Sequence, residues 1–535
     1  MQSVMTHNFS QVPKAEIPRS SFDRSHGLKT TFDAGYLVPV FVDEALPGDT
    51  FNLNMSVFAR LATPIRPFMD NLFLDSFFFA VPYRLVWDNF QRFNGEQVNP
   101  GDSTDFLIPQ MVSPEGGYAI GSLSDYFGLP TVGQVGASNT VSHSSLWHRA
   151  YNLIWNEWFR DQNLQNSVTV DKGDGPDDPA NYTLLRRGKR HDYFTSCLPW
   201  PQKGASVPLP LTGNAPVLPG AEHTTGSVAT GMKFRGTAAG IQPTTYPYMS
   251  SGVMQYCVSG SPSAPSSASP IYPSNLYADL SSVTAATVNS LRQAFQLQRL
   301  SERDARGGTR YTEIVRAHFG VVSPDARLQR PEYLGGGSTP VNINPIAQTT
   351  ATVSGQTPQG NLAAMGTIKA TGHGFTKSFT EHCLLIGLVC VRADLTYQQG
   401  MPRMFSRRTR FEHYWPALAG LGEQAVLNKE IYCDGSANDA LVFGYQERYA
   451  EYRYKPSVIT GKFRSTYATP LDVWHLSQKF TALPALGASF IEENPPISRV
   501  IAVTSEPQFL FDSFFSLKCA RPMPVFGVPG LIDHF

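Results

Sequence analysis

The sequence has few charged residues and few cysteines for its length of 535 residues. Only 16% of the residues are Asp, Glu, Lys or Arg, below the roughly 25% usual in soluble domains, and 43 acidic residues balance 43 basic ones. So little charge suggests that much of the surface contacts protein. Six cysteines make no disulfide framework and show no zinc spacing, so we expect synthesis in a reducing cytosol and no bound metal.

Long hydrophobic runs are also absent. His7, Lys14, Glu16 and Arg19 lie near the start with no apolar core between them, so we expect no signal peptide. The longest uncharged stretches are rich in Pro, Gly and Ser, which argues against a membrane span. The 44 glycines and 41 prolines limit long helices and predict a mainly β protein.

Strand signals are spread along the whole chain. Residues 51–61 alternate apolar and polar, as a half-buried strand does, whereas residues 72–82 are apolar on both faces. Further strands are expected at 377–394, 440–454, 499–505 and 508–520. Their wide separation predicts non-local pairing, which is typical of Greek-key sandwiches and jelly rolls.

Two helices are predicted between these strands. Residues 144–164 repeat tryptophan and aliphatic residues at helical spacing behind a serine cap, and residues 285–306 form a second stripe that Gly307 ends. We interpret both stripes as packing surfaces. Between Gly204 and Ala278 only Glu222, Lys233 and Arg235 are charged apart from histidine, which indicates an insertion; a second low-charge stretch covers 333–368.

Catalytic signatures are missing. The sequence has no GxSxG, HExxH, Walker-type or GxGxxG motif, so we expect no catalytic residues and no cofactor. An acidic segment offers four oxygen ligands for a hard cation, at Asp171, Asp174, Asp177 and Asp178. It departs from the EF-hand pattern, so a solvated turn is the favoured interpretation and no metal site is expected.

Arginine and aromatic residues gather in residues 401–417, MPRMFSRRTRFEHYWPA, as they do in sites that bind phosphates and stack bases. A strand would place Arg408 and Arg410 on one face, whereas a helix would align Arg403, Arg407 and Arg410. Arginine forks suit carboxylates of a neighbouring subunit equally well, so interface packing and nucleic-acid binding both remain open. A second basic cluster, RRGKR at 186–190, has an exposed turn as its alternative.

Several blocks resemble the major capsid proteins of the Microviridae, in particular the gokushovirus branch of small single-stranded DNA bacteriophages. They include FFFAVPYRLVWDNFQRFNGE, LRQAFQLQRLSERDARGGTRYTEIVRAHFG, GMPRMFSRRTRFEHYWPAL and RPMPVFGVPGLIDHF, at 77–96, 291–320, 400–418 and 521–535. The blocks span nearly the whole chain, so they are far more specific than a short motif.

The resemblance implies an eight-stranded antiparallel jelly roll, a viral β-sandwich with long loop insertions and a few helices. Sixty copies would close a T=1 icosahedral virion around circular single-stranded DNA in the cytoplasm of a bacterial host, with no membrane insertion. Residues 205–275 would form an exterior protrusion at the threefold axis. Implied partners are an internal scaffolding protein, a DNA pilot protein, a small basic DNA-packaging peptide and a host receptor.

Arg403, Arg407, Arg408 and Arg410 are the candidate nucleic-acid-binding residues under this resemblance. We expect most of them to pair with carboxylates across an interface, with Arg407 or Arg408 as the DNA contact. Two other functions remain as alternatives. A carbohydrate-binding or carbohydrate-active β-sandwich protein would show convergent carboxylates in a cleft, and a free single-stranded DNA binding protein would show a charged groove with stacking aromatics.

Overall fold

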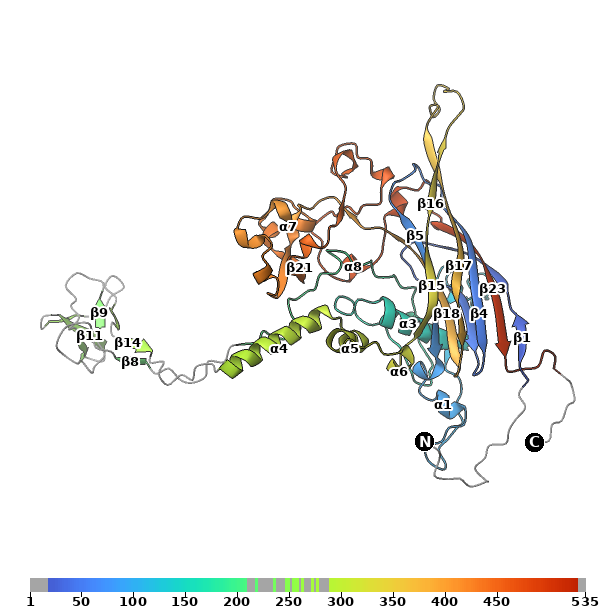
Figure 1. The fold of residues 1–535 in the computed structure, drawn as a ribbon, viewed down its shortest axis with the longest axis horizontal. Coiled ribbons are helices and arrows are strands. Elements are labelled where there is room, and N and C mark those ends of the chain that lie inside the picture. The colour runs from blue at the N-terminus through green and yellow to red at the C-terminus, as the bar shows by residue number, and fades with distance from the viewer. Residues whose placement is uncertain are drawn as a thin grey trace. The chain divides into compact units, whose positions relative to one another are not determined.

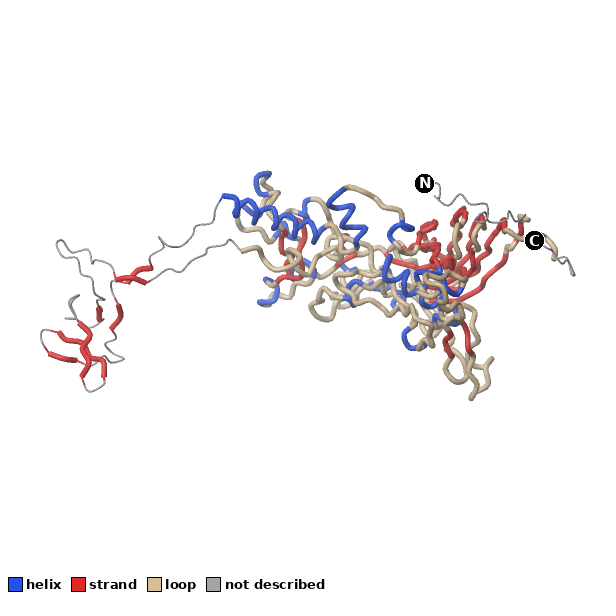
Figure 2. Tube along the Cα trace, turned by 90° about the horizontal axis from the view of Figure 1, so that it is seen from below, coloured by secondary structure: helices blue, strands red, loops and turns tan. Residues whose placement is uncertain are grey.

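The computed structural model describes residues 18–208 and 288–527, together with short strands between them. The chain forms two compact units, one made of Met1–Lys203 with Arg303–Phe535 and the other of Gly204–Glu302. The larger unit contains two large antiparallel sheets, besides smaller two-stranded ones (Figure 1), and Figure 2 shows its strands in red. The protein is therefore mainly β, as its composition predicts.

The first sheet has the strand order β1-β23-β4-β17-β16, and β2 also pairs with β23. Its strands are β1 (Ser20–Asp23), β2 (His26–Phe32), β4 (Thr50–Leu61), β16 (Asn342–Ala347), β17 (Leu362–Ser378) and β23 (Phe509–Arg521). Burial alternates strictly along β4, where Phe51, Leu53 and Met55 are buried and the residues between them are exposed. The predicted half-buried strand is confirmed.

The second sheet has the order β15-β5-β18-β3. Its strands are β3 (Val38–Ala45), β5 (Leu72–Pro82), β15 (Glu332–Pro340) and β18 (Cys383–Ala393). Every residue of β18 is buried, because this sheet is covered on both faces. Cys383 belongs to the core between the sheets and Cys390 to the core on the opposite face, as their odd spacing on a strand requires.

Aromatic side chains join the two sheets across the shared core. The ring of Phe41 on β3 lies 5.4 Å from that of Phe515 on β23 and 6.2 Å from that of Phe78 on β5, centroid to centroid. Phe78 in turn lies 5.6 Å from Phe375 on β17. These tilted and edge-on contacts lock the two sheets face to face.

A helix covers the outer face of the second sheet. Helix α3 (Leu146–Ile154) continues as a π-helical segment, η3 (Trp155–Phe159), and buries Ala150, Tyr151 and Ile154 with β18. The predicted packing stripe is confirmed. The helical segment stops five residues before 164. A serine, Ser145, precedes the helix as predicted, but its side chain makes no capping hydrogen bond, and the Ser144 hydroxyl accepts from the Leu146 backbone N–H at 3.4 Å.

A third cluster of buried residues carries the arginine-rich segment. Strands β20 (Glu423–Leu427) and β21 (Val442–Glu447) pair beside α7 (Asn428–Ile431) and α8 (Ala488–Ile491). The strand predicted at 440–454 is therefore shorter than expected. Residues 499–505 form no strand: the 3₁₀ turn η12 (Ile497–Arg499) overlaps their start, and Ile501 makes only an isolated bridge with Pro64.

The remaining elements of the larger unit are short. They are α1 (Phe90–Phe93), α2 (Leu123–Tyr126), α5 (Tyr311–Phe319), α6 (Asp325–Leu328), β6 (Gln110–Val112), β7 (Ser142–Ser144), β19 (Thr396–Tyr397) and β22 (Ser457–Val458). Cys197, Cys383, Cys390, Cys433 and Cys519 are free thiols. Among the described residues, no helix combines the length and apolar character that a membrane crossing needs.

The smaller unit contains short strands and most of the long helix α4 (Val288–Arg306). The strands are β8 (Val217–Pro219), β9 (Phe234–Gly236), β10 (Tyr246–Ser250), β11 (Val253–Val258), β12 (Ser261–Ser263), β13 (Ile271–Pro273) and β14 (Leu276–Ala278). The predicted helix is confirmed, although Val288 and Phe295 of its stripe are each 65% exposed. Most of 205–275 lies outside the described residues, so its placement as a protrusion stays a prediction.

Candidate nucleic-acid interface

The arginine-rich segment is neither a strand nor a continuous helix. It makes three separate 3₁₀ turns, η5 (Arg403–Phe405), η6 (Arg410–Glu412) and η7 (Pro416–Leu418). Pro402 precedes the first turn and Pro416 begins the last, where the fixed φ of proline favours the start of a turn. The segment thus presents its arginines in different directions, and neither expected alignment is formed.

Two of the four arginines are bound within their own chain. Arg403 donates from Nη1 to Glu430 Oε1 at 2.8 Å and to the carbonyl oxygen of Ala425 at 2.7 Å. Arg407 donates from Nη2 to Glu451 Oε1 at 3.0 Å, and its guanidinium lies 4.4 Å from the Tyr452 ring centre. The side chains of both arginines are less than one-fifth exposed. These two residues fasten the segment to the β20–β21 region.

Arg408 and Arg410 behave differently. Both are exposed, and the side chain of neither forms an ion pair among the described residues, although the backbone N–H of Arg408 donates to the Glu412 carboxylate. The Arg410 guanidinium lies 5.3 Å from the Phe411 ring centre and 5.1 Å from that of Trp415. We use the name Arg408 patch for five exposed residues of this segment, Phe405, Arg408, Arg410, Phe411 and Trp415. Exposed cations beside exposed rings are suited to a phosphate chain and its bases.

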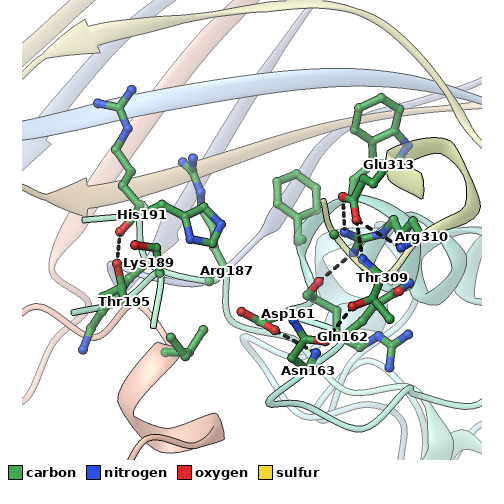
Figure 3. Close-up of a pocket in the computed structure, with 18 of the residues that line it drawn as sticks. Asp161, Gln162, Asn163, Arg187, Lys189, His191, Thr195, Thr309, Arg310 and Glu313 are labelled. Atoms are coloured by element: carbon green, nitrogen blue, oxygen red, sulfur yellow. Dashed lines mark hydrogen bonds and ion pairs between the residues drawn. The ribbon is translucent and has the colours of Figure 1, made fainter. Parts of the chain in front are cut away.

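The second basic cluster, 186–190, lines a cavity of about 1010 Å³ rather than a simple turn. Figure 3 shows Arg187, Lys189 and His191 on one wall, facing Asn163 and Arg310 on the other. The basic side chains around the cavity are Arg160, Arg187, Lys189, Arg190, His191, Arg306 and Arg310, and the carboxylates are Asp161 and Glu313. The aromatic part of the lining consists of Phe77, Phe79, Trp158, Phe159 and Tyr333.

Four of these cations already have protein partners. Arg187 pairs with Asp75, Arg306 with Glu423 and Arg310 with Glu313. Buried Lys189 donates to the carbonyl oxygen of Phe490 at 2.6 Å, and burial lowers its pKa to about 8.

Two arginines and a histidine of the lining, Arg160, Arg190 and His191, have no ion pair among the described residues. Arg160 donates from Nη1 to the Gln165 carbonyl oxygen at 3.2 Å. Burial and the neighbouring Arg310 lower the pKa of Arg160, although Glu157 and Asp161 act in the opposite direction. A cavity with this surplus of positive charge favours an oxyanion. Sequence reasoning missed Arg160 because it lies in a segment predicted to be helix, with no local signal of its role.

The acidic segment at 171–179 stabilises the fold. Asp177 accepts from Arg149 Nε at 2.8 Å, and both side chains are at most 1% exposed. Asp174 accepts from Trp87 Nε1 at 2.7 Å. Although burial opposes ionisation, hydrogen bonds from Arg149 and Tyr182 hold the pKa of Asp177 below its usual range. The solvated-turn prediction is therefore wrong for Asp177, whose sequence neighbours gave no sign of this partner.

Comparisons with known proteins identify the family. Residues 10–531 match the family described as Capsid protein (F protein). The chain is 48% identical over 554 residues to capsid protein VP1 of Bdellovibrio phage phiMH2K, covering 99% of this chain and 98% of the relative. It is 46% identical over 597 residues to capsid protein VP1 of Chlamydia phage 1, with the same coverage. For capsid protein VP1 of Spiroplasma virus 4 the identity is 36% over 544 residues, with 98% and 97% covered. The chain therefore belongs to the capsid protein (F protein) family, and its role is that of a major capsid protein.

Proposed function

We propose that sixty copies of this chain assemble into a T=1 icosahedral shell around a circular single-stranded DNA genome. The virion forms in the cytoplasm of a bacterial host and carries its own host-attachment surface. The observation that carries this proposal is the family match over residues 10–531, together with relatives that align along nearly their whole length. The role is structural, with no catalytic residues, cofactor or metal.

We further propose that the two sheets form an eight-stranded antiparallel jelly roll. The eight strands would be β2-β23-β4-β17 in one sheet and β3-β18-β5-β15 in the other, with β1 and β16 as additions. The order of the eight strands along the chain supports this proposal. Each strand lies in the other sheet from the strand before it, except that β5 and β15 lie in the same sheet. The long insertion that contains α3, α4 and the smaller unit lies at that exception. Such wrapping is the connectivity expected of a jelly roll.

The proposed DNA contacts are the Arg408 patch and the cavity. Arg408 and Arg410 are exposed, Arg410 lies beside the rings of Phe411 and Trp415, and Arg160 and Arg190 line the cavity without an ion pair. Arg403 and Arg407, the other two candidates, hold the segment in place through Glu430 and Glu451. A neutral subunit neutralises few phosphates, so the small basic DNA-packaging peptide neutralises most of them.

Assembly also involves other partners in this proposal. An internal scaffolding protein directs shell closure, and a DNA pilot protein accompanies the genome. Residues 205–275 form an exterior protrusion at the threefold axis that contacts the host receptor. Their Ser, Thr, Gly and Tyr content supports this role, because tyrosine supplies contact area and small polar residues supply adaptable hydrogen bonds. Exchanging this span for that of a related phage should change adsorption and leave assembly intact.

Co-expression with the scaffolding protein, followed by negative-stain electron microscopy, tests the shell. We expect closed particles with icosahedral order. A soluble monomer that never forms particles would overturn the proposal. If that monomer bound single-stranded oligonucleotides tightly, the protein would be a free DNA-binding protein, and if it bound glycans, a carbohydrate-binding β-sandwich.

A further inference from the structure

One hairpin of the larger unit extends beyond the neighbouring strands. It consists of β16, the connection 348–361 and the first residues of β17, and we call it the neutral hairpin (Figure 1). From Tyr333 to Ile368 the sequence contains no Asp, Glu, Lys, Arg or His. Residues 349–360 are nevertheless all exposed. A long solvated projection without a single charge is unusual, whereas the centres of protein interfaces are depleted of charge.

The connection is ordered by its own hydrogen bonds. Gln348 donates from Nε2 to Thr350 Oγ1 at 2.9 Å and to the Thr357 carbonyl oxygen at 3.2 Å, and its Oε1 accepts from the Thr357 hydroxyl at 2.5 Å. The backbone N–H of Gln359 donates to Thr352 Oγ1 at 2.9 Å. A preorganised loop loses less conformational entropy when it binds than a floppy one, so this arrangement suits a contact surface.

The base of the hairpin is fixed to the sandwich. Arg66 donates from Nη1 to Asn361 Oδ1 at 2.8 Å and to the Leu362 carbonyl oxygen at 2.6 Å. The register pairs Asn344 with Met365 and Ile346 with Ala363, which places Ile346 and Met365 on one face. Ile346 is 50% exposed and Met365 46%, so this face is apolar and open.

The chemistry of the hairpin selects its partner. With no cation it cannot neutralise phosphates, which argues against DNA. Strand β16 is the last strand of its sheet, yet Pro345 removes a backbone donor from that edge and opposes strand addition. The remaining mode of binding is side-chain contact between the hairpin and an apolar, uncharged surface of its partner. A shell built from one kind of subunit supplies such a surface at every neighbour.

We propose that the neutral hairpin binds a second copy of this chain and that this contact joins neighbouring subunits in the shell. The inference rests on the proposed self-assembly. Because the contact is uncharged, a charge of either sign at its centre should disrupt it equally. Val353, 56% exposed within the connection, and Ile346 are the positions where a charge would be desolvated on contact.

Charge insertion tests the contact. Val353→Lys, Val353→Asp and Ile346→Lys should each lower particle yield at least tenfold during co-expression with the scaffolding protein. Val353→Thr, which keeps size and neutrality, should assemble like the wild-type protein. Melting temperatures of the unassembled variants should match the wild type, because these side chains are exposed. Normal particle yields from both lysine variants would overturn the proposal.

A photo-reactive phenylalanine analogue at Val353 identifies the partner directly. We expect cross-links between ¹⁴N-labelled and ¹⁵N-labelled copies when the two are mixed before assembly. Cross-links confined to one copy, to DNA or to a host surface molecule would overturn the inference. If the wild-type chain forms no particles, the proposed shell is wrong. The same mixed-label experiment on the soluble protein still decides whether this hairpin contacts a second copy.

Discussion

Arg407 Nη2 lies 3.0 Å from Glu451 Oε1 of the same chain, and each of the two side chains is about one-tenth exposed. This pair was not visible in the sequence, where the two residues are 44 positions apart. The pair therefore changes the interpretation of the arginine-rich segment. Within its own chain Arg407 holds its loop, and the contact with DNA that the sequence led us to expect stays a prediction.

The stability of Arg407 and Arg408 variants should therefore differ. Arg407→Ala leaves Glu451 with Arg403, 3.7 Å away, as its one remaining cation among the described residues, beside a hydrogen bond from Gln424, and should lower the free energy of unfolding by about 3 kcal/mol. Arg408→Ala removes an exposed side chain without an ion pair and should change it by less than about 0.5 kcal/mol. Chemical denaturation of the unassembled protein measures both. Equal losses would contradict the assignment of Arg407 as a fastening residue.

Retention of DNA in the particle should depend on the four arginines of the proposed DNA contacts whose side chains have no ion pair. Arg160→Gln with Arg190→Gln, and separately Arg408→Gln with Arg410→Gln, should leave the yield of empty particles unchanged and release DNA at lower salt. Removing one arginine–phosphate interaction should reduce the slope of log affinity against log salt by about 0.7. The control is Lys29→Gln, an exposed cation already paired with Asp512 at 3.2 Å. Unchanged release from both double variants would remove these residues from the DNA interface.

Protonation of His148 should lower the free energy of unfolding at acidic pH. The ring is buried beside His143, and burial with that neighbour lowers its pKa to about 3, against 6.5 for an ordinary histidine. The folded state therefore binds fewer protons than the unfolded state between these values. The stabilisation by neutral His148 is present above pH 6.5 and is lost as pH falls toward 3.

Between pH 6.5 and 5 this loss should reach about 2 kcal/mol. His148→Gln, which cannot titrate, should flatten the dependence of melting temperature on pH. Asp177 also faces His148 and favours its protonation, so the measured midpoint reports the cluster. Identical pH profiles for the wild type and His148→Gln would contradict the prediction.

The pairing of β17 with β4 should depend on the absence of a side chain at Gly374. A Cβ there would lie 1.9 Å from the Leu53 carbonyl oxygen. Gly374→Ala must push the strands apart and should destabilise the protein by about 3 kcal/mol. Gly420→Ala, where a Cβ would meet nothing within 4 Å, should be nearly neutral. Comparable soluble yield and melting temperature for the two variants would refute the close approach.

Elements whose burial pattern is local could be predicted from the amino-acid sequence alone. Alternation in β4, the doubly covered character of β5 and the opposite faces of Cys383 and Cys390 all follow from the period of two along a strand. The stripe of α3 follows from helical spacing in the same way. The long sequence blocks identified the capsid family, because specificity grows with the length of a match.

Features that depend on distant segments emerged only from the folded chain. Strand β15 contains Gly335, Gly336 and Gly337, a run that predicts a loop, yet a Cβ at Gly336 would lie 2.0 Å from the Ser76 carbonyl oxygen. Glycine is needed there because the two strands approach closely. Local strand propensity cannot predict this approach.

The partners of the charged side chains also depend on the fold. Glu430 and Glu451 reach Arg403 and Arg407 only because the β20–β21 region folds behind the arginine segment. Arg160 and Arg190 share a cavity only because the chain after α3 and the 186–190 segment meet there. An ion pair forms where the folded chain brings two charges within a few ångströms of each other. Local sequence patterns do not predict that distance.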